Sequence, residues 1–259
     1  MDSADALHPP ATEVFRRRFI AFHKWDRNFF LAFLAACWLG VIMGFIPAVT
    51  KRYTGHADYP APPILKIHAA AFTGWMLLLT TQILLIRNTQ PKLHMKLGLV
   101  GFALIPVMAV SAFFSEVYSQ RFYFAHPPNS QAFFILPIFY VLSFTTLATA
   151  ALANRANPPA HKRLILLATT MIVGAAYARW WFPTMILWVG DGLGGMLIYT
   201  YAGTNLLLAA ALTYDWVTRR RVHRVYEIAV PAILASEIAT TVIYHSPRWL
   251  PIAHLAIQP

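Results

Sequence analysis

The sequence predicts an all-α, polytopic membrane protein, a bundle of seven transmembrane helices. Of its 259 residues, 58% are apolar and 12% are charged, whereas a soluble domain carries about 25% charged residues. Seven apolar runs are long enough to cross a bilayer, which takes roughly 20 residues. These runs lie at about 29–48, 64–86, 97–118, 131–153, 164–188, 195–216 and 226–245. Backbone groups in lipid must be hydrogen-bonded within the chain, so we expect each run to form a helix.

The distribution of basic residues predicts the orientation of this bundle. Fifteen of the 21 lysines and arginines lie before the first run or in the loops after the second, fourth and sixth runs. Because cytoplasmic loops are enriched in Lys and Arg, we expect a cytoplasmic N-terminus and a C-terminus outside. The expected organisation is a basic N-terminal segment at 1–27, a membrane domain at 28–245 and an outer tail at 246–259.

The formal net charge of +11 fits a membrane surface better than a nucleic acid. The basic residues lie in short loops between apolar runs, where anionic lipid headgroups attract them. We therefore expect the lipid bilayer, and no nucleic acid, as a partner. Within 14–25, Phe15, Phe19 and Phe22 have helical spacing. This pattern predicts either a basic amphipathic helix on the inner leaflet or a basic leader without regular structure.

Two glycines in the first apolar run predict a close helix contact. Gly40 and Gly44 in "GVIMG" form a small-xxx-small pair, which lets two membrane helices approach closely. The contact can lie within this chain. Alternatively, it can form a homodimer or join a partner in a membrane complex.

A short motif appears at two of the predicted inner helix starts. The stretches "HMKLGLVG" and "HKRLILLA" share the pattern H-x-[KR]-L-x-L-x-[GA], which aligns His94 with His161, and His223 follows 62 residues later. Lys96 and Arg163 in these motifs lie near helix N-termini, where the macrodipole is already positive. A bound phosphate or other anion would supply the missing negative charge. The alternatives are a topology signal that contacts lipid headgroups and a metal site formed by the three histidines.

Ionisable residues inside the predicted spans are candidates for function, because a charge at the bilayer centre costs roughly 2.5–3.5 kcal/mol on insertion scales. His68, Glu116, Arg179 and Glu237 fall in the predicted outer half, with His245 at its edge. Arg179 and Glu237 lie at matching depths, so we predict an ion pair between the fifth and seventh helices. The group is either a polar pocket that opens to the outside or a structural ion pair that fixes helix packing.

The two histidines of this group determine which cofactors the sequence could bind. A haem b with two histidine ligands needs them on facing helices, and His68 with His245 is the available pair in the outer half. Copper or zinc would be bound by His68, Glu116 and His245. The sequence contains no G-x-S-x-G, H-E-x-x-H or phosphate-loop motif, so no reaction class is predicted.

The stretches "LKIHAAAFTGWMLLLTTQILL", "LHMKLGLVG" and "AHKRLILLAT" together resemble a family of bacterial inner-membrane proteins without an assigned activity. The resemblance covers roughly 28–245, with Met95 and Ile165 at positions where that family more often has Arg and Met. It implies a bacterial inner-membrane location. The matching motif residues are His68, His94, Gly98, His161, Lys162, Arg163 and Arg179.

These observations predict an inner-membrane protein whose His/Arg/Glu site binds a small molecule, a metal or haem. A looser analogy, to small membrane proteins that assist copper insertion into terminal oxidases, suggests a redox or respiratory-assembly role. One alternative is a carrier or lipid-handling protein, favoured by prolines inside four spans and by the repeated motif. Another is a non-catalytic accessory subunit in which the charges only hold helices together.

Overall fold

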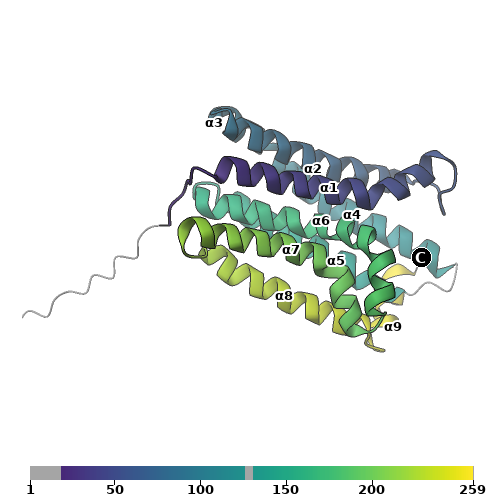
Figure 1. Ribbon diagram of the computed structural model, residues 1–259. Coiled ribbons are helices and arrows are strands. Elements are labelled where there is room, and N and C mark those ends of the chain that lie inside the picture. Colours follow the sequence, from purple (N-terminus) through teal and green to yellow (C-terminus); the bar gives the residue numbers. More distant parts are fainter. Residues whose placement is uncertain (1–18, 126–130, 259) are drawn as a thin grey trace, which may run out of the picture.

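The computed structural model describes residues 19–125 and 131–258, and in these ranges it contains helices and no strand. Figure 1 shows the long helices lying side by side along a common direction. The helices are α1 Asp26–Tyr53, α2 Pro63–Arg87, α3 Pro91–Gly98, α4 Val100–Phe124, η1 Gln131–Phe134, α5 Ile135–Ala153, α6 Pro158–Val189, α7 Leu193–Arg219, α8 Arg224–Tyr244 and α9 Trp249–Ile257.

Seven helical segments of the described chain are long and apolar enough to cross a membrane, which indicates an integral membrane protein and confirms the seven predicted helices. Two of the seven are composite, because α3 continues into α4 and η1 into α5. The helices extend beyond the apolar runs, and three of them start at Pro63, Pro91 and Pro158. Proline suits the first helical position because its missing N–H would have no partner there.

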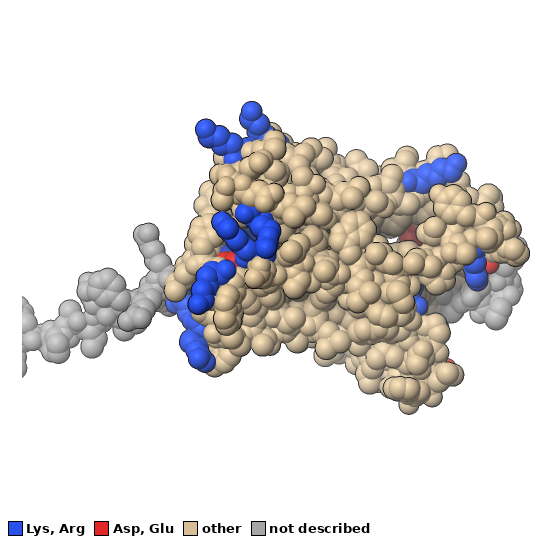
Figure 2. All heavy atoms as spheres, turned by 45° about the horizontal axis from the view of Figure 1, so that its top comes forward, with Lys and Arg blue, Asp and Glu red and all other residues tan. Residues whose placement is uncertain are grey.

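The surface has the charge distribution expected of a protein in a bilayer. Figure 2 shows lysine and arginine side chains gathered toward the two ends of the molecule, with an almost uncharged belt between them on the visible face. We call the end where α1, α6 and α8 begin and α7 finishes the basic end.

Helix α6 is the central helix of the bundle. It packs most extensively against α1, α5 and α7, and its middle is almost entirely buried. The buried Thr169 and Thr170 hydroxyls donate to carbonyls one turn earlier in α6. Trp75 of α2 donates its indole N–H to Thr169 Oγ1 at 3.1 Å. These hydroxyl and indole groups around the middle of α6 are thus paired, which lowers the cost of burying them in an apolar medium.

The two glycines of α1 lie against α6. The backbone at Gly40 touches the Tyr177 ring, and the backbone at Gly44 touches the Ala176 carbonyl, so that neither position has room for a Cβ. The Tyr177 hydroxyl donates to the Ala36 carbonyl at 2.8 Å across the same contact. The small-xxx-small pair therefore packs within this chain, and α6 covers the face that we considered for a homodimer or a complex partner.

Of the two alternatives for 14–25, the amphipathic helix is not present over 19–25, which has no regular structure, and 14–18 lie outside the described residues. Tertiary contacts replace the helical hydrogen bonds. Arg219 Nε donates to the Ile20 carbonyl at 3.2 Å, and Lys162 Nζ donates to the Ala21 carbonyl at 2.6 Å. Cations from α6 and α7 thus hold this segment against the basic end.

The expected C-terminal tail contains a helix that packs onto the bundle. In α9, Trp249 donates its indole N–H to the Ala132 carbonyl at 3.0 Å. Arg121 of α4 donates from Nε to the Ile257 carbonyl at 2.7 Å. These bonds frame a small apolar cluster that joins α4, η1 and α9. Its buried members are Val117, Phe134, Ala253 and Ile257.

The α1–α6 contact gives a first prediction. Replacing Gly44 by Ala should destabilise the protein by about 1–3 kcal/mol, because the added methyl group must displace the Ala176 backbone. Gly74 in α2 has open space where its Cβ would lie, so Gly74→Ala should be neutral or slightly stabilising. Thermal unfolding of both variants in detergent measures the difference. Equal unfolding midpoints would contradict the close contact.

Candidate functional site

The basic end contains a buried ion-pair network that starts at the beginning of α6. Arg163 Nε donates to Oδ2 of Asp215 in α7 at 2.7 Å, and Arg163 Nη2 donates to Oδ1 of the same carboxylate. Both side chains are only 2% exposed. A two-pronged arginine–carboxylate pair is among the strongest charge-assisted contacts. The negative charge expected near the start of α6 is therefore supplied by Asp215 of the chain itself.

Asp26, the first residue of α1, forms the second half of this network. Arg219 Nη2 donates to both Asp26 oxygens at 2.8 and 3.0 Å. Lys162 Nζ donates to Oδ2 at 2.7 Å, and the Tyr214 hydroxyl donates to Oδ1 at 2.5 Å. One carboxylate thus joins α1, α6 and α7. The sequence reasoning considered neither aspartate, although the spacing of Asp215 and Arg219, an i,i+4 pair, indicated one of the contacts.

Phe19, in the segment before α1, and His223, directly before α8, pack against this network. The Phe19 ring lies 4.5 Å from the Arg163 guanidinium and meets the His223 ring edge-on at 4.6 Å. His223 Nδ1 accepts a hydrogen bond from the Val225 N–H and so caps α8. Burial, followed by the repulsion of the Arg163 guanidinium, lowers the pKa of His223 to about 4. The imidazole is therefore neutral at pH 7, as its acceptor role requires.

The structure divides the residues of the predicted inner anion site. Arg163 and His223 belong to the network around Asp215. His161 Nδ1 donates to the Ala151 carbonyl at 2.8 Å. His94 and Lys96 lie on α3, where the buried Nδ1 of His94 has no hydrogen-bond partner in the described part of the chain and Lys96 is exposed. These five residues do not converge on one anion.

The predicted ion pair between Arg179 and Glu237 is wrong. It is not among the ion pairs of the described residues. Arg179 Nη1 donates to the Ala175 carbonyl of its own helix at 3.0 Å, and its guanidinium lies 5.1 Å from the Phe45 ring of α1. Glu237 Oε2 accepts from Asn205 Nδ2 of α7 at 3.0 Å. Equal depth along the two helices does not suffice for an ion pair, because Arg179 points toward α1 whereas Glu237 points toward α7.

The predicted metal sites are also not assembled. Across 19–125 and 131–258, no three His, Cys, Asp or Glu side chains come together as a metal site. This applies to the set of His68, Glu116 and His245 and to the three histidines of the repeated motif. His245 Nδ1 instead donates to the Thr241 carbonyl at 2.9 Å. Glu116 accepts from Gln120, and His68 packs against Phe72 with ring centroids 4.2 Å apart.

A polar cluster in the interior of the bundle was not predicted as a unit. It lies between α5, α7 and α8, well inside the candidate spans, and it centres on Glu237, which is 2% exposed. Asn205 binds one oxygen of this carboxyl group. Tyr201, one turn before Asn205 on α7, and Thr204, the residue directly before Asn205, are 0% exposed. The ring centroids of Tyr201 and Tyr140 of α5 lie 6.2 Å apart.

Four buried oxygen atoms of this cluster make no hydrogen bond of ideal geometry within the described residues. Two of them, Oε1 of Glu237 and Oδ1 of Asn205, face no other polar group of the described chain, whereas the Tyr201 hydroxyl lies beside Thr240 and Thr241 and Thr204 Oγ1 beside the Tyr140 hydroxyl. Leaving a buried polar atom unpaired costs about 1–3 kcal/mol. The free oxygens of Glu237 and Asn205, on two facing helices, therefore make this region the candidate site of the interior.

A glycine on α6 makes room for part of the cluster. A Cβ at position 174 would collide with Thr204 Oγ1 and come close to the Tyr140 ring. Gly174 therefore allows α7 and α5 to bring these hydroxyl groups against the central helix. Sequence reasoning selected Glu237 because it is charged, but the neutral residues around it carried no signal on their own.

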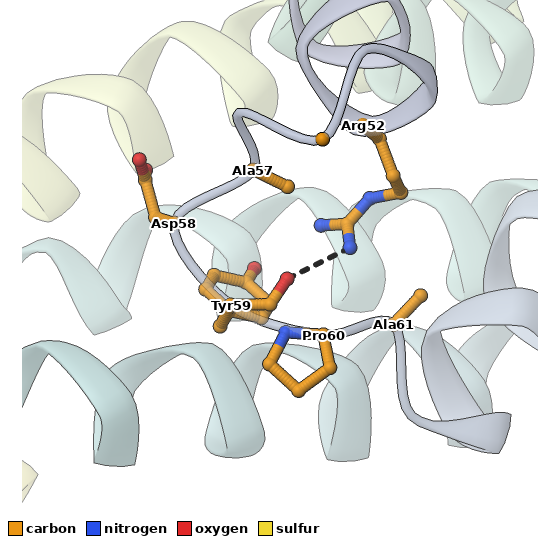
Figure 3. Close-up of a pocket in the computed structure, with 7 residues that line it drawn as sticks. Arg52, Ala57, Asp58, Tyr59, Pro60 and Ala61 are labelled. Atoms are coloured by element: carbon orange, nitrogen blue, oxygen red, sulfur yellow. Dashed lines mark hydrogen bonds between the residues drawn. The ribbon is translucent and has the colours of Figure 1, made fainter.

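A surface hollow in the α1–α2 loop contains no buried polar atom without a partner among the described residues, unlike the Glu237 cluster. It has a volume of about 380 Å³ and is lined mainly by small residues and backbone. Figure 3 shows Arg52 donating to the Tyr59 carbonyl, at 2.9 Å, while Asp58 points away from the hollow. The arginine fixes the loop, and its charge is directed at the main chain.

No family model matches this chain, and no curated protein or solved structure is significantly similar to it. The resemblance to a bacterial inner-membrane family therefore stays a prediction.

The Arg163–Asp215 pair gives a second prediction. Asp215→Asn should destabilise the protein by about 3–5 kcal/mol, because it leaves a buried guanidinium without its counter-charge. Asp191 is exposed in the loop between α6 and α7, so Asp191→Asn is the matched control and should change stability by less than about 0.5 kcal/mol. Thermal unfolding in detergent measures both. Equal effects would show that the pair does not stabilise the fold.

The His223 environment gives a third prediction, for pH dependence. The pKa of about 4 in the folded protein lies below the ordinary histidine value of 6.5, so the unfolded chain binds a proton first as the pH falls. Stability should therefore decrease from about pH 6.5 toward pH 4. Asn also caps helices well and does not titrate, so His223→Asn should flatten this part of the stability profile. Parallel profiles for wild type and variant, measured by thermal unfolding, would contradict the assignment.

Proposed function

We propose that the chain is an integral membrane protein whose helical bundle binds a small alkali cation at the Glu237 cluster, and that it acts as a cation carrier. The observation that carries this proposal is the pair of buried, unpartnered oxygens on Glu237 and Asn205, with the Tyr201 hydroxyl on the same helix as Asn205. Oxygen ligands suit hard cations. One carboxylate with a neighbouring neutral amide oxygen matches a single positive charge.

The arrangement of α8 supports this proposal. This helix carries Glu237 and contacts its neighbours less extensively than α6 does. Pro231 interrupts α8 between the basic end and Glu237, and an interior proline removes a backbone hydrogen bond and kinks a helix. Movement of α8 relative to α7 would therefore give an ion access to the cluster without opening the α5–α6–α7 core.

Location and orientation form part of the same proposal. The basic end should face the cytoplasm, because loops rich in Lys and Arg remain on that side, and a bacterial inner membrane is the proposed location. The redox or respiratory-assembly role expected from the sequence, with haem, copper or zinc, has no support from the contacts around His68 and His245. A carrier, one of the alternatives considered, agrees better with an unpartnered acidic site.

The fourth prediction tests cation binding. Li⁺, Na⁺ or K⁺ should raise the unfolding temperature of the full chain over N-methylglucamine at equal ionic strength. Above Kd the stabilisation should rise with the logarithm of the cation concentration, reaching about 2.7 kcal/mol at 100 times Kd. Glu237→Gln should abolish the shift because it removes the charge. Glu227, exposed near the start of the same helix, provides the matched control Glu227→Gln, which should retain it.

Two results would overturn the proposal. One is the absence of any cation-specific shift in the wild-type protein. The other is a shift of equal size in Glu237→Gln. Cation flux from proteoliposomes then tests the carrier role separately: wild type and Glu227→Gln should release the stabilising cation, and Glu237→Gln should not.

A further inference from the structure

A second candidate site lies on the opposite side of α5 from the Glu237 cluster. A cavity of about 150 Å³ is bounded by α4, η1 and α5. Phe134, which is 1% exposed, forms part of its inner wall, whereas Phe113 and Leu142 are 41% and 62% exposed. Because these two residues are exposed, the cavity opens sideways at the surface of the bundle, at the level of the candidate spans.

The cavity is apolar except for one acidic group. Its lining includes Glu116 together with alanine, phenylalanine, proline, isoleucine, valine and leucine side chains. Gln120 Nε2 donates to Glu116 Oε1 at 2.7 Å. This is the one hydrogen bond that the described residues give the carboxyl group, and the Arg179 guanidinium acts on it electrostatically from farther away. The site therefore offers one strong acceptor in apolar surroundings.

The dimensions and walls of the cavity indicate the chemical class of the ligand. An apolar cavity of this volume holds a benzene-sized ring. Phe113 and Phe134, with ring centroids 6.0 Å apart, provide aromatic surfaces for edge or offset contacts. A hydroxyl donor supplies a hydrogen bond to the free Glu116 oxygen. A neutral hydroxyl also costs less to desolvate than an ammonium group in the same apolar cavity.

We propose that this cavity binds the ring of a membrane-soluble phenol, with the hydroxyl donating to Glu116 and the alkyl tail lying along the outside of α4 and α5 in the lipid. The site is separate from the Glu237 cluster, because Val141 and Ile138 of α5 line the cavity whereas Tyr140 faces the cluster. Occupation of one site does not require the other.

The fifth prediction tests this assignment with defined probes. The full-length protein in lipid nanodiscs is labelled with a diazirine-bearing 4-alkylphenol, and the adducts are located by peptide mass spectrometry. Labelling of α4 and α5 around the cavity should be saturable. Unlabelled 4-dodecylphenol should compete at a concentration about 10-fold or more below that of its methyl ether, which lacks the donor.

Protein variants separate the acceptor from the cavity itself. Glu116→Leu should weaken competition by the phenol to the level of the ether while leaving the ether unchanged. Val141→Phe fills the cavity and should abolish labelling. Val110→Phe makes the same change at an exposed position of α4 outside the cavity and should label like wild type. Glu237→Gln should also label like wild type, so failure of the cation proposal is distinguishable from failure of this one.

The wild-type experiment decides the proposal even where a cavity variant fails to fold. Equal competition by 4-dodecylphenol and its methyl ether would overturn the role of Glu116. Labelling that does not saturate, or that is spread over the lipid-facing helices, would overturn the site. A 4-alkylbenzylamine that competes better than the phenol would also overturn the proposed ligand class.

Discussion

The buried pairing of Arg163 with Asp215 is the interaction on which the rest of the basic end depends. It brings positive charge to the start of α6 and negative charge to the end of α7, the reverse of what the two helix dipoles favour. Mutual neutralisation makes both charges tolerable. Asp26 does the same for Arg219 and Lys162, and these cations also bind the carbonyls of residues 20 and 21. The network therefore fixes the entry of the chain into the membrane domain.

The Glu237 cluster differs from the basic end in one physical respect. At the basic end every buried carboxylate has cationic partners within hydrogen-bond distance. At Glu237 an amide satisfies one oxygen, and no ion pair of the described residues reaches the other. The basic end is therefore a structural site, because its buried carboxylates are already paired with cations of the chain. The Glu237 cluster has unfilled acceptors, and this contrast is why we assign ligand binding to the interior and not to the repeated motif.

The sequence predicted the fold better than the site, for physical reasons. Seven apolar runs require seven helices in lipid, and the spacing of Gly40 and Gly44 correctly indicated a close helix contact. The contacts of Arg179 were missed because residue depth follows from position along a helix, whereas the direction of a side chain depends on how the helix is rotated in the bundle. Asp215 and Asn205 were missed because neither belongs to a motif. Their roles arise from what faces them on α6 and α8.

Helix α5 connects the two candidate sites. Tyr140 faces the Glu237 cluster, while the next residue, Val141, lines the Glu116 cavity. Successive residues of a helix point about 100° apart. The single helix α5 therefore separates the acidic interior site from the acidic site at the lipid surface. A ligand that shifts α5 changes the space available on both sides. Any resulting coupling must be reciprocal: if filling the cavity favours the cation, the cation equally favours filling of the cavity.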